Sequence, residues 1–290
     1  MTEPTSHTIK VPGATLTYDV RSNGSSTAPA LLIIGSPMGA GGFVTLAGHF
    51  PDRTVVTYDP RGVERSPKTD DTSESTPDEH ADDVHAVIQA IGGGPVDLFA
   101  SSGGAVNSLA LVARHPEDVR ILVAHEPPLG EVLSDRDTAL AAAEGIQKTY
   151  RSSGFGPAMA KFIALVTHKG EVPAGFADGP SPDPAMFGLP TEDDGTRNDP
   201  LVGQNIVSST HYKPDFDAIR AAATRIVVAV GAESDGEMAH RGGVGVAERL
   251  GTTPVTFPSG HGGFLGGEYG QTGEPEAFAK ALREALETGN

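Results

Sequence analysis

A serine placed between an apolar strand and an apolar helix is the feature that most constrains this chain. The run Val96–Phe99 has the length and composition of a buried strand. The apolar helical pattern that follows the serine ends at His115 and Pro116. A strand, a serine and a helix joined without a spacer form the layout of a nucleophile elbow, a sharp turn that exposes the serine hydroxyl.

Small residues decide which of two adjacent serines occupies that turn. With Ser102 at the turn, the positions two before and two after it hold Ala100 and Gly104. With Ser101 at the turn, Phe99 would stand at the earlier position, where its bulk would clash with neighbouring backbone. The sequence therefore predicts that Ser102 is the nucleophile of a covalent mechanism.

Composition narrows the class of protein further. The chain has 290 residues, enough for a large core, and no cysteine, which excludes disulfides, thiolate metal sites and a cysteine nucleophile. Its formal net charge of −17 disfavours nucleic acids and anionic membranes as partners. The N-terminus lacks the basic start of a secretory signal, and no apolar run is long enough to span a membrane. We therefore expect a cytoplasmic protein.

Strand and helix patterns alternate on both sides of a helical region, which predicts an α/β fold. We expect a mostly parallel central sheet flanked by helices, built from residues 1–130 and 216–290, with a helical cap inserted at residues 131–215. The expected strands are Thr8–Val11, Ala14–Val20, Ala30–Ile34, Thr54–Tyr58, Val96–Phe99, Ile121–Ala124, Arg225–Val230 and Pro254–Phe257. The expected helices include Thr76–Gly92, Asp137–Tyr150, Pro157–His168, Met238–Leu250 and Glu274–Thr288. Between the cap helices and the second part of the core, Glu171–Pro200 is dense in Pro, Gly and Asp and is expected to be a loop.

One histidine is placed to serve as the base that a serine nucleophile needs within hydrogen-bond reach. His261 follows the last expected strand, in the glycine-rich loop Ser259–Phe264. It also comes last in the chain order of nucleophile, acid and base that this sheet topology requires. We therefore predict His261, among the ten histidines, as the catalytic base.

These motifs together resemble the α/β-hydrolase fold family over nearly the whole chain. The resemblance implies hydrolysis of esters, lactones, thioesters or amides through a covalent serine intermediate, with no metal or organic cofactor. The chain departs from the family at Glu64, where a glycine is usual. The segments that carry the resemblance are Ala30–Pro37, Thr57–Gly62 with Ser66, the elbow around Ser102, Arg114–Glu117 and Ser259–His261.

The acid of the triad has three candidates. The family most often places an aspartate after the strand that follows the cap, and in this chain that position holds Ser234. Glu233 and Asp235 flank Ser234 and could substitute for the aspartate. Glu126 follows the strand after the elbow, where some relatives carry their acid and where α/β sites are built. We prefer Glu126 and keep Asp235 and Glu233 as alternatives.

The oxyanion hole needs two N–H groups. The backbone of Gly103, the residue after the nucleophile, is expected to supply one. Alignment of Gly35–Pro37 with the Gly-x-Pro loop of the family points to Ser36 for the other, with Met38 as the alternative. Pro37 has no N–H and is excluded.

Two other polar groups have structural interpretations. His80 and His85 lie five positions apart on one expected helix, so their side chains diverge, and we expect a solvated helix face rather than a metal site. Asp59 and Arg61 lie in a tight turn after a strand, where buried structural hydrogen bonds are expected. We predict no metal site.

The sequence therefore predicts a serine hydrolase that cleaves a carboxylic ester or lactone through an acyl-enzyme on Ser102. Its partner would be a small apolar substrate, and its oligomeric state is open. Two alternatives stay open: a cofactor-free haloperoxidase or perhydrolase with the same triad, and a non-catalytic relative that binds a small molecule. An apolar substrate pocket, or packing of the cap onto the core, would explain the helical face formed by Met159, Phe162, Ile163 and Val166.

Overall fold

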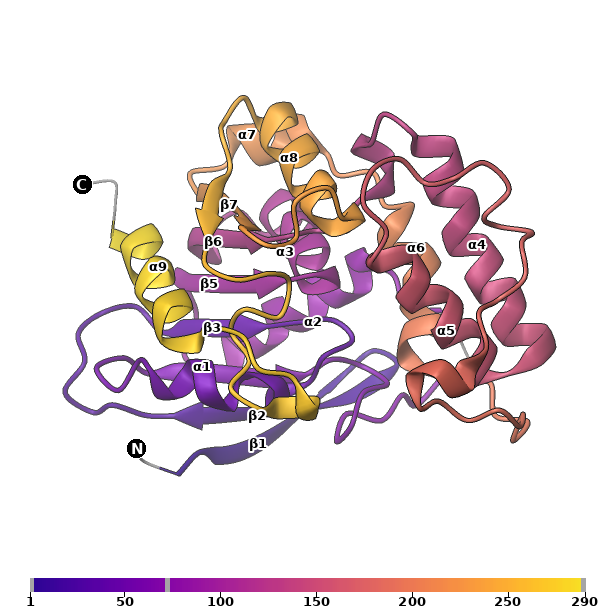
Figure 1. Cartoon of the computed structure of the whole chain (residues 1–290). Coiled ribbons are helices and arrows are strands. Elements are labelled where there is room, and N and C mark those ends of the chain that lie inside the picture. Colours follow the sequence, from indigo (N-terminus) through magenta and orange to yellow (C-terminus); the bar gives the residue numbers. More distant parts are fainter. Residues whose placement is uncertain (1–2, 71–73, 288–290) are drawn as a thin grey trace.

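An eight-stranded sheet forms the centre of the computed structural model, which describes residues 3–70 and 74–287 (Figure 1). The strand order is β1-β2-β4-β3-β5-β6-β7-β8. β2 pairs antiparallel with β1 and with β4, and all the other neighbours pair in parallel. The strands are β1 (Thr5–Val11), β2 (Ala14–Arg21), β3 (Leu31–Ile34), β4 (Val55–Asp59), β5 (Val96–Ser101), β6 (Val119–His125), β7 (Arg225–Gly231) and β8 (Val255–Phe257). The mostly parallel α/β sheet predicted from the sequence is confirmed.

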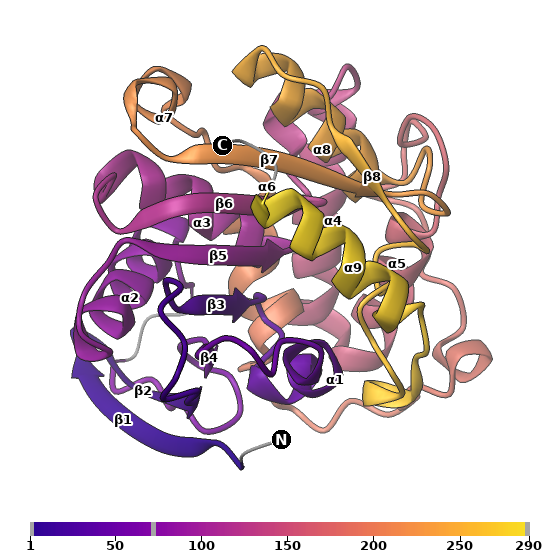
Figure 2. The ribbon, with the colours of Figure 1, turned by 90° about the vertical axis from the view of Figure 1, so that its left-hand side faces the viewer.

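Helices cover both faces of the sheet, which explains why its central strands are continuously apolar. α1 (Val44–Gly48) and α9 (Pro275–Glu287) pack on one face, and Figure 2 shows α9 in front of the strands. The other face is covered by α2 (Pro77–Ala90), α3 (Gly103–Arg114), α7 (Phe216–Ala221) and α8 (Met238–Leu250). α2 begins with a capping box, in which Thr76 and Glu79 satisfy each other's backbone N–H groups.

The register of the central strands brings their carboxyl ends together. Ser101 at the end of β5 lies beside His125 at the end of β6, and His125 lies beside Ala229 of β7. The residues that follow these strands therefore meet at one edge of the sheet. Parallel α/β sheets bind their ligands at this edge.

A separate layer of helices lies beyond this edge, and the arrowheads of β3 and β5 point towards it in Figure 1. The helical layer consists of α4 (Arg136–Ser153), α5 (Phe155–Val166), a π-helical turn (Pro200–Asn205) and α6 (Ile206–Thr210), with short 3-10 turns at Gly130–Val132 and Pro184–Phe187. These helices share their own apolar core, which includes Ile146, Tyr150 and Val202. No strand interrupts residues 131–215, as the sequence predicted.

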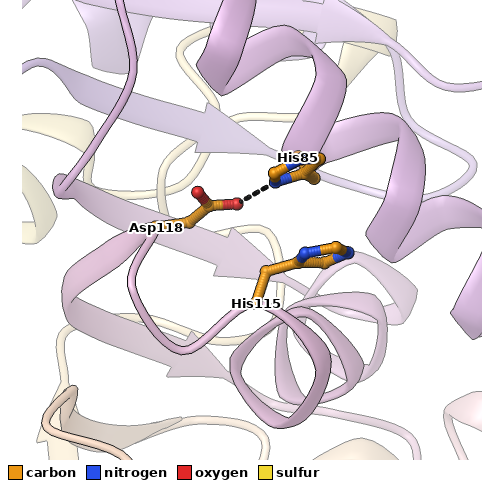
Figure 3. A group of neighbouring side chains, drawn as sticks. All are labelled: His85, His115 and Asp118. Carbon is orange, nitrogen blue, oxygen red and sulfur yellow. Dashed lines mark hydrogen bonds and ion pairs between the residues drawn. The ribbon is translucent and has the colours of Figure 1, made fainter.

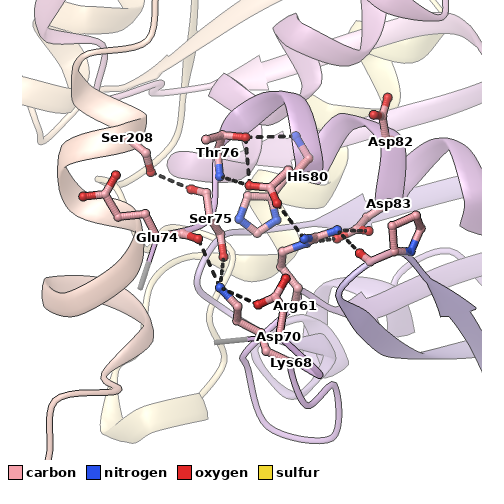
Figure 4. A network of polar contacts seen from close by, with 12 residues as sticks. Arg61, Lys68, Asp70, Glu74, Ser75, Thr76, His80, Asp82, Asp83 and Ser208 are labelled. Atoms are coloured by element: carbon pink, nitrogen blue, oxygen red, sulfur yellow. Dashed lines mark hydrogen bonds and ion pairs between the residues drawn. The ribbon is translucent and has the colours of Figure 1, made fainter. Parts of the chain in front are cut away.

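Polar contacts join the helical layer to the sheet domain (Figure 4). Ser208 donates a hydrogen bond to the carbonyl of Ser75, and His80 Nε2 lies 2.8 Å from Asn205 Oδ1. His80 is buried, which lowers its pKa to about 4. Asp83 is also buried and pairs with Arg61. The expectation of a solvated face was therefore wrong for His80, because Asn205 of the helical layer covers that side of α2, and Arg61 from the turn after β4 covers Asp83.

None of the helices in the described residues is both long enough and apolar enough to cross a membrane. The exposed 3-10 turn η5 (Glu268–Gly270) lies in the loop between β8 and α9.

Candidate active site

Ser102 occupies a strained turn between β5 and α3. Its backbone has φ 58° and ψ −130°, a left-handed conformation that is uncommon for any residue with a side chain. A Cβ on Gly104 would lie 2.8 Å from the Cα of Gly35, and one on Gly103 would lie 2.6 Å from the carbonyl oxygen of Ser36. The small residues after Ser102 therefore allow α3 to approach the loop that follows β3. The sequence argument for small residues had invoked only a clash with neighbouring backbone.

The two adjacent serines have different surroundings. Ser101 ends β5, is 3% exposed, and lies with its Oγ 3.1 Å from Nδ1 of His125. Ser102 is only partly buried, and its N–H donates to the carbonyl of His125 at 2.9 Å. Of the two hydroxyls, that of Ser102 is the more accessible to a substrate.

His261 follows β8 and Glu126 follows β6, and the two form a close pair at the carboxyl edge of the sheet. His261 Nδ1 lies 2.6 Å from Glu126 Oε2; the Glu126 side chain is fully buried and that of His261 is 39% exposed. Burial raises the pKa of Glu126, but hydrogen bonds from His261 and Ser234 and the nearby imidazoles outweigh it and bring that pKa to about 2. The carboxylate is therefore ionised and orients the imidazole with Nε2 away from it.

The two alternative acids lie elsewhere. Asp235 is 87% exposed, and its Oδ1 lies 3.9 Å from Nδ1 of His240. Glu233 is exposed and accepts a hydrogen bond from Ser259 at 3.2 Å. The structure thus brings His261 to Glu126 and not to either flanking carboxylate.

The third contact of a triad is not formed. Within residues 3–70 and 74–287, no hydrogen bond joins the hydroxyl of Ser102 to His261. Such contacts are often long in an unliganded enzyme and tighten when the substrate binds.

The candidate oxyanion hole lies between α3 and the loop after β3. The backbone hydrogen bonds of the described residues leave the N–H groups of Gly103, Ser36 and Met38 unused. The loop is held in place by Asp59, which is fully buried and accepts the N–H of Ala40 at 2.8 Å. The prediction of buried structural hydrogen bonds is confirmed for Asp59.

Arg61 and Glu64 occupy the turns that follow β4. Arg61 is 3% exposed and makes a two-pronged ion pair with Asp83 (Figure 4), so its predicted structural role is also confirmed. Glu64 has φ 44°, which explains why glycine is usual at this position. Its Oε1 accepts the hydroxyl of Tyr269 at 3.2 Å.

Two residues that contact Glu126 were not predicted from the sequence to do so. Ser234 donates its hydroxyl to Glu126 Oε1, and the N–H of Gly231 donates to the same oxygen at 2.8 Å. The sequence did offer a signal for Ser234, because it stands where the resemblance places an acid. No local pattern marks Gly231.

His125 lies directly behind the pair. It is fully buried, and its ring centroid is 5.9 Å from that of His261 and 5.2 Å from that of Phe278. Burial lowers its pKa to about 4, so the ring is neutral at physiological pH. At this pH His125 therefore adds packing but no charge to the site, and it carries charge only in acid, where Glu126 also titrates.

A second cluster of side chains raises the question of a metal ion (Figure 3). In the described part of the chain, His85, His115 and Asp118 are the one group with ligand atoms within 4.8 Å of one another. The two rings stack with centroids 4.0 Å apart and planes 13° apart. Since a ring nitrogen's lone pair lies in the ring plane, nearly parallel rings cannot both aim at one ion. This arrangement does not fit a metal.

Comparisons with known proteins agree with this geometry. The pattern of the alpha/beta hydrolase fold matches residues 16–206. The uncharacterized hydrolase YraK of Bacillus subtilis (strain 168) is 30% identical over 288 residues, which cover 97% of this chain and 95% of YraK.

Two solved structures share the fold. The carboxylesterase CesB (YbfK) from Bacillus subtilis superposes with a TM-score of 0.67 at 14% identity, covering 100% of this chain and 93% of CesB. The enol-lactonase from Burkholderia xenovorans LB400 superposes with a TM-score of 0.65 at 15% identity, covering 97% and 99% of the two chains. With the matched pattern and the related hydrolase, these likenesses place this chain in the α/β-hydrolase fold family.

Proposed function

We propose that this protein is a serine hydrolase that cleaves a carboxylic ester or lactone through an acyl-enzyme on Ser102. The observation that carries the proposal is the 2.6 Å contact between His261 and the buried carboxylate of Glu126, at the sheet edge where Ser102 turns. An imidazole held in this way can accept a proton at Nε2 while the carboxylate stabilises the resulting charge.

Acylation begins with transfer of the Ser102 proton to Nε2 of His261. The Ser102 oxygen attacks the carbonyl carbon of the substrate, and the carbonyl oxygen becomes an oxyanion. We propose that this oxyanion accepts hydrogen bonds from the N–H groups of Gly103 and Ser36, with Met38 as the alternative to Ser36. Gly103 is the first residue of α3, so the helix N-terminus also favours the negative charge.

Collapse of the oxyanion breaks the bond to the leaving oxygen, which takes the proton from His261. His261 then removes a proton from water, and the resulting nucleophile attacks the acyl carbon. The second oxyanion collapses, the carboxylic acid leaves, and Ser102 recovers its proton from His261. Besides residues of the chain, the cycle uses only the substrate and water.

We propose that residues 131–215 act as a cap that shapes the substrate pocket between two parts of the core, residues 1–130 and 216–290. Within this cap, one face of α5 carries apolar side chains that are only half-buried. This face would suit an apolar acyl or alcohol group. The side chains are Met159, Phe162, Ile163 and Val166. The carboxylesterase and enol-lactonase folds named above are consistent with an ester or lactone substrate.

Labelling of the serine tests the proposal. A fluorophosphonate should modify one site per chain at Ser102, and the protein should hydrolyse p-nitrophenyl acetate or a γ-lactone. Ser102→Ala and His261→Ala should lose both, whereas Ser101→Ala, which removes the adjacent hydroxyl, should keep the label. Labelling with peracid formation from acetate and hydrogen peroxide, but without ester hydrolysis, would instead indicate a perhydrolase. Absence of labelling and of hydrolysis would indicate a binding protein and contradict the proposal.

A further inference from the structure

The carboxylate of Glu126 divides its two oxygens between two tasks. Oε2 faces Nδ1 of His261, and Oε1 accepts both the N–H of Gly231 and the hydroxyl of Ser234. Every donor comes from outside β6: two from the end of β7 and the loop after it, and one from the loop after β8. The position of the acid is therefore set by neighbouring strands.

Glu126 needs this support because of its length and its backbone. A glutamate has one more rotatable side-chain bond than an aspartate, so more conformational freedom must be lost to hold its carboxylate still. Its backbone has φ 48°, with its N–H bonded to the carbonyl of Ala229 at 3.0 Å. The backbone turn aims the side chain towards β7, and the contacts to Oε1 then decide where Oε2 points.

Ser234 lies buried in the loop after β7, where its hydroxyl contacts Glu126. Its side chain is 2% exposed, and its hydroxyl has two acceptors, Glu126 Oε1 and, at 3.2 Å, the carbonyl of Gly231. The backbone of the loop has contacts of its own, such as the N–H of Glu237 bonded to the carbonyl of Ser234 at 2.9 Å. Removal of the hydroxyl alone would therefore leave the loop backbone in place.

We propose that Ser234 is a positioning residue, which holds the carboxylate of Glu126 so that its second oxygen faces His261. This inference rests on the proposed function, because it assigns Ser234 a role in the same Ser102–His261–Glu126 site. Ser234 does not touch the reacting atoms. It acts on the reaction through Glu126, both by fixing the rotamer and by stabilising the ionised carboxylate while His261 carries a proton.

A double-mutant cycle separates this role from a purely structural one. Hydrolysis of p-nitrophenyl acetate would be measured for the wild type, Ser234→Ala, Glu126→Gln and the double variant. Loss of a hydrogen bond to a charged group predicts that Ser234→Ala lowers kcat by about 10- to 100-fold, with KM within about twofold of the wild type. In the Glu126→Gln background, Ser234→Ala should have an effect of less than about threefold.

Two further variants test whether the effect of Ser234→Ala comes from its hydroxyl. Ser234→Thr retains the hydroxyl and should restore most of kcat. Ser259→Ala is the matched control, since it removes a loop hydroxyl that bonds Glu233 rather than Glu126, and it should keep wild-type kcat. Equal losses from Ser234→Ala in both backgrounds, or unchanged kcat in the wild-type background, would overturn the inference. Retained turnover in Ser102→Ala would overturn the proposed function, whereas loss there with wild-type kcat in Ser234→Ala would overturn the positioning role alone.

Discussion

The two ends of β6 carry two histidine–carboxylate pairs that are nearly equal in geometry. Asp118 immediately precedes the strand and lies 2.6 Å from Nδ1 of His85; Glu126 immediately follows it and lies 2.6 Å from Nδ1 of His261. Both carboxylates are at most 1% exposed, and the histidines are 31% and 39% exposed. The distance and burial of such a pair therefore do not by themselves mark a catalytic site.

What differs is the end of α3 that each pair meets. Gly103 begins α3 next to the strained turn at Ser102, so free N–H groups and the positive end of the helix dipole lie at the carboxyl edge of the sheet. His115 follows the last turn of α3, where the carbonyl groups and the negative end of the helix dipole lie instead. The carboxyl edge thus suits an oxyanion, and the amino edge does not.

The largest expected effect comes from removing the proposed nucleophile, Ser102, which lies at the carboxyl edge beside the pair of His261 and Glu126. Ser102→Ala should lower kcat for ester hydrolysis by about a millionfold, because loss of a triad serine removes the covalent route. Steady-state kinetics with active-site titration would measure this. A loss of less than about a hundredfold would contradict the assignment of Ser102.

The second prediction compares the two carboxylates directly. Glu126→Gln should lower kcat by about 10⁴-fold, because the amide cannot stabilise the imidazolium of His261 and favours the wrong tautomer. Asp118→Asn, the matched change at the other end of β6, should leave kcat per folded molecule within about twofold. Asp235→Asn should also have little effect.

The opposite result would identify a different acid. If Asp235→Asn abolished turnover and Glu126→Gln preserved it, the acid would be Asp235 and the pair at the carboxyl edge would resemble the one at the amino edge. Circular dichroism of each variant would separate loss of catalysis from loss of folding.

Much of the fold was predictable because local patterns determine it. The buried strands are continuous apolar runs, and α8 occupies Met238–Leu250 as expected from its helical spacing. The short helices α6 and α7 escaped prediction because five- and six-residue helices carry too little periodicity. The burial of His80 was also missed, since it depends on Asn205, a residue 125 positions away along the chain.

The positions in the candidate site that depend on which strands end at the same edge of the sheet could be predicted from the sequence. The contacts between side chains that come from several strands could not. The turn at Ser102 and the position of Glu126 after β6 follow from which strands end at one edge of the sheet. The contact of Ser234 with Glu126 joins positions 108 apart, and that of His85 with Asp118 joins positions 33 apart. Ser234 stands where the resemblance places an acid, but no local pattern indicates that it contacts Glu126 or that His85 contacts Asp118.

The third prediction concerns the buried imidazoles, whose protonation opposes folding. His125 and His80 are neutral when folded, with pKa values lowered by burial to about 4, whereas an unfolded histidine has a pKa of about 6.5. Between these values the unfolded chain binds more protons, so stability is complete above about pH 6.5 and falls as the pH drops towards 4. Each imidazole should contribute about 3 kcal/mol to this loss.

Urea denaturation at pH 7 and pH 5 would test this dependence. His125→Phe keeps a ring of similar size among the phenylalanines and cannot be protonated, so it should remove about half of the acid destabilisation and leave the part that belongs to His80. A variant with the same pH slope as the wild type would show that His125 is not the group that titrates.

The smallest expected effect is at the stacked imidazoles of the amino edge. His115→Ala removes one ring of the stack and its hydrogen bond with the exposed Asp82, so it should cost at most about 1 kcal/mol of stability. It should leave kcat within about twofold. A drop in kcat of more than tenfold with stability intact would show that the two ends of β6 are coupled. The difference between the two ends of α3 would then not explain which histidine–carboxylate pair supports activity.

His85→Ala should likewise leave kcat nearly unchanged. Its imidazole faces Asp118 rather than solvent-exposed Asp82, so its removal should cost somewhat more stability.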